Sequence, residues 1–166
     1  MELKELVKIK GGKRLPKGKM LSSIANQHPY IKVRDMKPTT IQLNSDFEYV
    51  DNQTFKSISK YIVNTGDVIL SIVGTIGNVS IIGKSLDNAS LTENCVKFVC
   101  DYRLNPVYLF YFLSSNKGQE QIKQGIVGTT QPKLPLYNIE KINIPLYSKE
   151  KQQHIVNSIR GYSYVM

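Results

Sequence analysis

Lys and Arg residues near the N-terminus are the side chains of this 166-residue chain with the clearest chemical potential. The first 40 residues hold ten of them against three acids, so most of the formal net charge of +9 lies at one end of the sequence. Such a cluster favours a polyanionic partner, because each neutralised phosphate releases condensed counterions. A solvated face that keeps the protein soluble is the alternative interpretation. The candidate phosphate ligands are Lys10, Lys13, Arg14, Lys17, Lys19, Lys32 and Arg34.

A second group of polar side chains could read the edges of nucleic-acid bases. Residues 128–133 form a short loop with a glycine at its start and a proline near its end, and it offers hydroxyl, amide and amino groups. These groups recognise base edges in the major groove, and Gln131 could make a bidentate contact to adenine. A solvated turn without any contact is the alternative. The candidates for base or loop contacts are Thr75, in an earlier turn, and Thr129, Thr130, Gln131 and Lys133.

Patterns for catalysis are missing from the sequence. It has no glycine-rich loop ending in Lys-Ser or Lys-Thr, no closely spaced His and Glu ligands, and no Gly-x-Ser-x-Gly turn. Residues 105–108, Asn-Pro-Val-Tyr, are weakly similar to the Asn-Pro-Pro-Tyr element of amino-methyltransferases, but a helix cap explains them better. His28 and His154 are expected on the surface, and Cys95 and Cys100 as reduced thiols on opposite faces of one strand, which indicates a cytoplasmic protein. We therefore predict no catalytic residue, no metal and no cofactor.

Alternating and β-rich segments, interrupted by helical ones, must position these groups. Strands are expected at residues 3–10, 30–34, 47–50, 67–73, 78–82, 91–100 and 141–145. Helical segments are expected at residues 52–60, from 106 to 113, 116–125 and 148–160, with Asn105, Ser115 and Ser148 as caps. The strand at 30–34 would place Lys32 and Arg34 on one face. The pattern predicts one α/β (α+β) domain with a mixed, largely antiparallel twisted sheet and a few packed helices, and no segment suits a membrane span.

The last helix has one apolar face, formed by Ile155, Val156 and Ile159. A helix of about eleven residues is marginal in isolation, so this face must pack on the domain or on another chain. Gly161 is expected to end the helix, and no heptads follow it. The C-terminal helix is thus expected to be cut short.

Eight segments, in order along the chain, resemble the target-recognition domain of the DNA-specificity subunit of type I restriction-modification enzymes. Individually these motifs are weak, but together they span nearly the whole chain. They are Gly12–Gly18, Tyr30–Met36, Gly66–Ser71, Gly74–Val79, Asn105–Leu113, Gly128–Gln131, and Ile142–Leu146 leading to Glu150–Val156.

The resemblance implies a subunit without a catalytic centre that reads one half of a split double-stranded DNA target. It would present this DNA to methyltransferase subunits, which bind S-adenosylmethionine, in a complex that also holds a restriction subunit. In such proteins a long spacer helix follows the Glu-x-Gln-Gln element and docks the partners. Residues 1–147 would then be the recognition domain, 148–160 the start of the spacer helix and 161–166 a tail. A second recognition domain or a homodimer would supply the other half-site.

Two other classes of protein stay open at this point. A remnant of a DNA methyltransferase would need a cofactor site, and none is visible in the sequence. An RNA-binding or protein-interaction domain would use the same cations for another partner.

Overall fold

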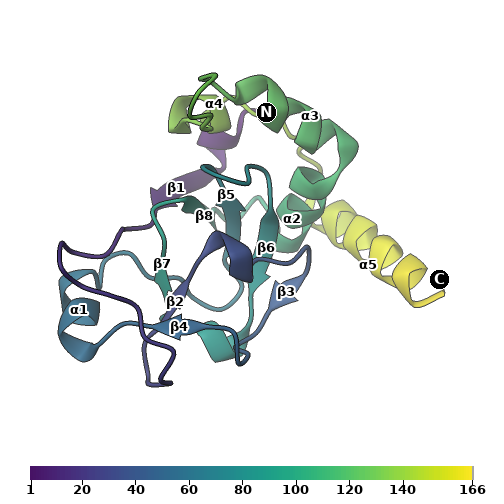
Figure 1. Cartoon of the computed structure of the whole chain (residues 1–166). Helices are drawn as coiled ribbons and strands as arrows, with labels where there is room; N and C mark the ends of the chain where they lie inside the picture. The colour runs from purple at the N-terminus through teal and green to yellow at the C-terminus, as the bar shows by residue number, and fades with distance from the viewer. Residues whose placement is uncertain (166) are drawn as a thin grey trace.

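A computed structural model describes the backbone of residues 1–165 and the side chains of residues 1–161. Its central element is a five-stranded sheet in the order β1-β8-β5-β6-β3, and a three-stranded sheet in the order β4-β2-β7 lies beside it (Figure 1). Among the strands of the described residues, only the β3·β6 and β2·β7 pairs are parallel. The mixed, largely antiparallel architecture is therefore confirmed. The strands are β1 (Val7–Gly11), β2 (Pro29–Ile31), β3 (Thr40–Ile41), β4 (Glu48–Tyr49), β5 (Val68–Ser71), β6 (Val79–Ile82), β7 (Ser90–Leu91) and β8 (Cys95–Cys100).

Three helices gather on one side of the larger sheet, α1 lies at the far edge of the molecule, and α5 points away from the body (Figure 1). The α-helices are α1 (Asn52–Ser57), α2 (Pro106–Ser114), α3 (Asn116–Gly125), α4 (Leu136–Glu140) and α5 (Lys149–Val165). Short 3-10 turns occupy Leu3–Glu5, Val33–Asp35 and Lys84–Leu86. The predicted caps are confirmed, because Asn105 accepts from the N–H groups at the start of α2, Ser115 from Gly118 and Ser148 from Lys151.

The hydrophobic core has two layers, one on each face of the five-stranded sheet. Successive residues of a strand point to opposite faces. Leu70 and Phe98 therefore pack toward the helices, with Leu109 of α2. Their strand neighbours Ile69 and Cys95 pack toward the smaller sheet. Both cores are needed to hold the loops at the ends of these strands in fixed positions.

Of the predicted strands, one is shorter in the structure and one is absent from it. The strand that begins at Tyr30 ends at Ile31, because the Asp35 carboxylate accepts the Lys32 N–H at 2.8 Å and turns the backbone into a 3-10 turn. Residues 141–145 make one bridge to the N-terminal residues in place of a strand, with Ile142 and Ile144 bonded to the main chain of Leu3 and Met1.

The last helix is longer than predicted. Helix α5 continues to Val165, so Gly161 does not end it. A glycine inside a helix costs about 1 kcal/mol relative to alanine and does not by itself break the helix. Among the described residues, no helix is long and apolar enough to cross a membrane.

Candidate nucleic-acid interface

Several loops meet at one end of the five-stranded sheet. Strand β1 ends where β8 begins, with Gly11 opposite Val96, and β5 ends at the same level, with Ser71 opposite Cys95. The segment after β1 and the turn between β5 and β6 therefore leave the sheet at the same end. This end carries most of the predicted site.

The loop at residues 128–133 is attached to this end of the sheet. Val127 and Lys133 close it with two main-chain hydrogen bonds of 2.9 and 3.0 Å, and Leu134 donates to the Ile72 carbonyl at 2.9 Å. Gly128 has a φ of 91°, which only glycine adopts readily. The loop thus projects its exposed tip, Thr129 to Pro132, from a fixed base.

Thr75 lies in the neighbouring β5–β6 turn and is also exposed. The Ser71 hydroxyl stiffens this turn, because it donates to the Thr75 carbonyl at 2.5 Å and accepts the Asn78 N–H at 2.9 Å. Val73, just before the turn, forms a bridge with Lys133. The structure therefore brings together the residues that the sequence suggested for base contacts, although they lie more than 50 positions apart.

The basic loop, residues 12–19, begins at the same end of the sheet. Gly12 donates to Cys95 at 3.1 Å and Lys13 donates to Leu91 at 2.8 Å. A Cβ atom on Gly12 would lie 1.9 Å from the Thr92 carbonyl oxygen, so only glycine allows this approach. The Tyr30 hydroxyl donates to the Lys13 carbonyl at 2.7 Å and fixes where the loop leaves the sheet. Burial raises the pKa of Tyr30 to about 12, so this donor keeps its proton at neutral pH.

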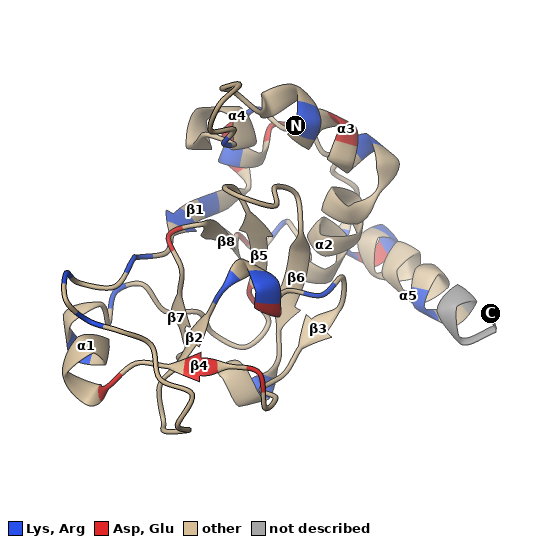
Figure 2. Ribbon diagram, in the orientation of Figure 1, with Lys and Arg blue, Asp and Glu red and all other residues tan. Residues whose placement is uncertain are grey.

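Most cations of the basic loop and of β1 are available to a ligand. Lys10, Lys13, Arg14 and Lys17 are exposed, and within the described residues none of them forms an ion pair. Figure 2 shows these positive charges along β1 and the loop beside α1. Lys19 differs, because it lies 3.9 Å from Asp51 and 3.4 Å from the Gln53 amide oxygen.

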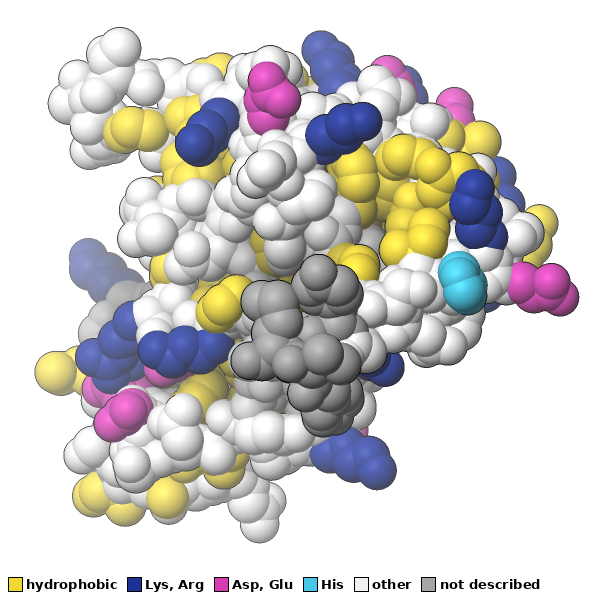
Figure 3. Space-filling view, turned by 90° about the vertical axis from the view of Figure 1, so that its right-hand side faces the viewer, with side chains coloured by type: hydrophobic (Ala, Val, Ile, Leu, Met, Phe, Trp, Pro, Cys, Tyr) yellow, Lys and Arg dark blue, Asp and Glu magenta, His cyan; other side chains and the backbone are white. Residues whose placement is uncertain are grey.

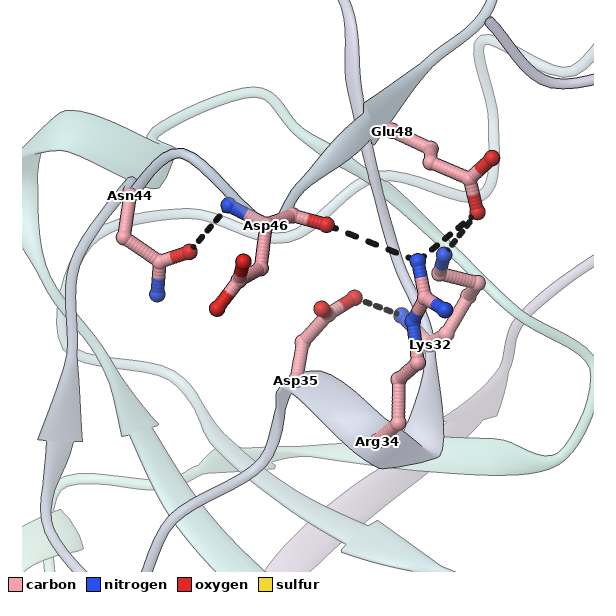
Figure 4. A network of polar contacts seen from close by, with 6 residues as sticks. All are labelled: Lys32, Arg34, Asp35, Asn44, Asp46 and Glu48. Atoms are coloured by element: carbon pink, nitrogen blue, oxygen red, sulfur yellow. Dashed lines mark hydrogen bonds and ion pairs between the residues drawn. The ribbon is translucent and has the colours of Figure 1, made fainter. Parts of the chain in front are cut away.

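Lys32 and Arg34 do not lie on one strand face, which corrects the expectation from the sequence. Both side chains contact Glu48 of β4, Arg34 at 3.0 Å (Figure 4). The ammonium of Lys32 and the guanidinium of Arg34 lower the pKa of Glu48, so this carboxylate stays charged and offsets part of their charge. Arg34 also reaches the Asp46 carbonyl at 3.5 Å. These two cations are therefore weaker candidates for phosphate binding than those of the basic loop.

The three apolar residues of the last helix have different surroundings. Val156 is 1% exposed and belongs to the core between the helices and the sheet. Val156 thus packs on its own domain, which does not favour a partner-docking role, and that role stays a prediction. Ile155 and Ile159 line an apolar groove of about 390 Å³ with Tyr111 and Phe112 of α2. Hydrophobic side chains gather on this side of the molecule (Figure 3).

Sequence reasoning missed the residue that anchors α5. Gln152 is fully buried and its amide makes three hydrogen bonds of 2.8 Å, with the main chain of Arg103, Asn105 and Tyr147. The signal was present in the Glu-x-Gln-Gln element, where a polar residue falls on the apolar face of the helix. The buried Gln152 therefore explains the second-last position of this motif by its structural role, which is to attach α5 to the domain.

The chemistry of this surface is recognition by charge and hydrogen bonds. Both cysteines are free thiols, and burial raises the pKa of each to about 12, so neither is a ready nucleophile. Within the described part of the chain, no group of three His, Cys, Asp or Glu residues could hold a metal ion. The exposed groups suit phosphates and base edges.

Comparisons with known proteins agree with this arrangement. Residues 1–163 match the family described as "Type I restriction modification DNA specificity domain". No curated protein matches the sequence. One similar chain comes from a structure described as the "Structural basis underlying complex assembly" and conformational transition of the type I R-M system. It has 16% sequence identity and a TM-score of 0.76, and the match covers 99% of this chain and 37% of that one.

Two solved S subunits also share the fold. The S subunit from M. genitalium has 17% identity and a TM-score of 0.67, with 99% of this chain and 38% of that chain covered. The HsdS subunit from Thermoanaerobacter tengcongensis has 16% identity and a TM-score of 0.71, with 99% and 36% covered. The chain thus spans less than two fifths of the S subunits that it matches.

Proposed function

Because the chain belongs to the type I restriction modification DNA specificity domain family, we propose that it is a target-recognition domain that reads one half of a bipartite double-stranded DNA sequence. The observation that carries this proposal is the convergence at one end of the sheet. There, the basic loop with its unpaired cations begins at the end of the sheet from which two stiff turns project exposed hydroxyl and amide groups.

The two kinds of group have separate roles. Lys10, Lys13, Arg14 and Lys17 bind phosphates and set the position of the domain on the duplex, which carries no sequence information. Gln131 and the hydroxyl groups of the two turns then reach base edges in the major groove. The closed base of the 128–133 loop favours this role, because a tip held in place loses less conformational entropy on binding.

Partners of the domain complete the enzyme in this proposal. Methyltransferase subunits bind S-adenosylmethionine and modify the DNA that the domain selects, and a restriction subunit joins the same complex. Helix α5 leads toward these subunits, and a second recognition domain or a second copy of the chain reads the other half-site. The place of action is the cytoplasm, and the two free thiols fit that setting.

Salt-dependent binding tests the phosphate role. Anisotropy of a labelled duplex of about 30 base pairs, roughly three helical turns, is measured from about 50 to about 200 mM salt. Replacing Lys13, Arg14 and Lys17 by Ala should flatten the plot of log K against log salt by about 3 units. The control replaces Lys149, Lys151 and Arg160 of α5, which removes the same charge from the other side of the molecule (Figure 1).

An equal change of slope in both variants would leave only a non-specific charge effect and would contradict the proposal. Tighter binding to single-stranded RNA than to duplex DNA would do so as well, as would binding of radiolabelled S-adenosylmethionine by the chain itself.

Selection of bound duplexes from a random pool tests the role in base recognition. Gln131→Ala should weaken binding to the selected duplex by about 1–3 kcal/mol and relax the preference at one position, while non-specific binding stays the same. Gln124→Ala, an exposed change on α3, is the matched control. Equal loss on all sequences would make the 128–133 loop a positioning element.

A further inference from the structure

The basic loop does not stand alone but packs on α1. Leu15 and Leu21 turn inward and join Phe55 and Tyr61 around the buried side chain of Ile58. This small core is separate from the two cores of the sheets. It unites residues 12–28 with residues 51–61, and we refer to this unit as the α1 lobe.

The α1 lobe is strongly basic. Its two segments contain six Lys or Arg residues and one acid, Asp51. That acid is already engaged, because it accepts the Thr54 N–H at 2.7 Å as the cap of α1 and lies 3.9 Å from Lys19. These contacts lower the pKa of Asp51, and the main cause is the Thr54 N–H. The other five cations of the lobe form no ion pair with a described residue.

Two of these cations lie outside the segment that sequence reasoning singled out. Lys56 and Lys60 are exposed at the end of α1 and just after it, and within the described residues neither side chain forms an ion pair or a hydrogen bond. The core of the lobe holds α1 against the basic loop, and Figure 2 shows Lys or Arg residues on both segments. Lys13, whose ammonium lies 5.6 Å from the centre of the Tyr61 ring, links the two segments directly.

Two exposed apolar side chains on the same lobe indicate a surface that a binding partner covers. Met20 is 86% exposed and directly follows Lys19, and Ile24 is 79% exposed. The segment that carries them is ordered, because Ser22 exchanges two main-chain hydrogen bonds with Tyr49 and the Asn26 amide donates to the Val50 carbonyl at 2.8 Å. Proteins that bind DNA grooves present apolar side chains beside cations in this way.

We propose that the α1 lobe extends the DNA-contact surface beyond the basic loop, so that Lys56 and Lys60 bind backbone phosphates and Met20 and Ile24 contact the adjoining groove. This inference rests on the proposed function and extends the contact beyond the loops at the end of the sheet. The free cations and the exposed apolar pair are separate observations that favour the same partner. The lobe core holds both in place before DNA arrives.

The first experiment compares two double variants of the full chain by anisotropy with the labelled duplex. Lys56→Ala with Lys60→Ala should flatten the salt dependence by about 2 units, so the fall in affinity from about 50 to about 200 mM salt becomes about tenfold smaller. Lys149→Ala with Lys151→Ala removes the same charge from α5 and should leave most of the slope in place. Equal slopes for the two variants would overturn the inference.

The second experiment replaces the apolar pair. Met20→Gln with Ile24→Gln should weaken binding several-fold and leave the salt dependence unchanged, because no charge is removed. Both side chains are exposed, so the urea midpoint should match that of the unaltered chain, and this is checked in parallel. Unchanged affinity would overturn the groove contact.

The two proposals fail in different ways. If replacement of Lys13, Arg14 and Lys17 flattens the salt dependence and replacement of Lys56 and Lys60 does not, only the further inference is overturned. If neither variant changes the salt dependence, the proposed function itself is contradicted.

Discussion

Gln152 joins α5 to the rest of the domain through three hydrogen bonds of its side-chain amide. Its Nε2 donates to the carbonyls of Arg103 and Tyr147, and its Oε1 accepts the N–H of Asn105, each at 2.8 Å. The side chain is fully buried, so water does not compete for these groups. Replacing Gln152 therefore tests whether the helix is held by this joint.

Gln152→Leu keeps the approximate volume and removes all three hydrogen bonds. Two carbonyls and one N–H are then buried without partners, and each such group costs about 1–3 kcal/mol. Because the main chain can relax toward water at some of them, we expect the free energy of unfolding to fall by about 3–5 kcal/mol. That is a large part of the roughly 5–15 kcal/mol that stabilises a domain.

Gln152→Glu adds a dependence on pH. Burial against two carbonyls disfavours the charged form, so the pKa of the introduced carboxyl rises above its ordinary value of about 4.3. Because the pKa is higher in the folded than in the unfolded state, the folded protein is more stable when this carboxyl is protonated than when it is charged. The loss of stability should therefore be smallest below about pH 4 and should grow as the pH rises through the raised pKa.

Urea unfolding at about pH 4 and about pH 8 measures both effects. Gln153→Glu is the matched control, because the same substitution falls on the neighbouring exposed residue and should cost about 0.5 kcal/mol or less. If Gln152→Leu unfolds at the same urea concentration as the unaltered chain, the joint does not hold the helix. Equal losses for the two Glu variants at about pH 8 would refute the argument from burial.

Three further changes test how the interface and the helix are built. Gly12→Ala should destabilise the fold by about 1–3 kcal/mol in urea, since its Cβ would overlap main chain, whereas Gly11→Ala, with nothing within 4 Å, should have little effect. Val156→Ala should cost roughly 2 kcal/mol in the isolated chain, because two buried methyl groups are lost, and an unchanged midpoint would restore its role in partner docking. Cys95 and Cys100 should react with a disulfide reagent at pH 8 far more slowly in the folded chain than in urea, since burial raises the pKa of each to about 12, and equal rates would contradict this.

The sequence predicted best what neighbouring residues decide. The start of α2 follows from Asn105 and Pro106, and the start of α3 from Ser115, because a cap bonds to N–H groups two or three positions away. The β5–β6 hairpin follows from its two β-rich runs and the glycines between them. Such signals need no knowledge of the rest of the fold.

The errors occur where a distant group decides the local structure. Alternation after Tyr30 favours a strand, but Asp35 binds the Lys32 N–H, and Glu48, on another strand, draws the Lys32 and Arg34 side chains together. Residues 141–145 have a strand-like composition, yet their main-chain partners are the first residues of the chain. Neither partner could be identified from the local pattern.

In the candidate site, too, the sequence predicted what local residues decide and not what distant contacts decide. Sequence reasoning found the residue types, because cations and exposed Thr and Gln are visible in any sequence. It could not find their meeting at one end of the sheet, which depends on the bridge between Val73 and Lys133. Lys56 and Lys60 were not predicted as contact residues, because α1 lies beside the basic loop only through the packing of Phe55 and Tyr61 on that loop.

The anchoring of α5 fixes the direction of this helix relative to the domain, which the sequence alone did not suggest. Gln152 and Val156 hold the first turns of the helix in the domain, and the helix then points away on the side opposite the α1 lobe (Figure 1). Its direction is therefore fixed relative to the loops at the end of the sheet, because the same core supports both. A subunit bound along α5 would meet DNA at a set distance and angle, since no flexible linker lies between the joint and the recognition loops. If the proposed function holds, the domain would set the orientation of a bound subunit as well as select the DNA sequence.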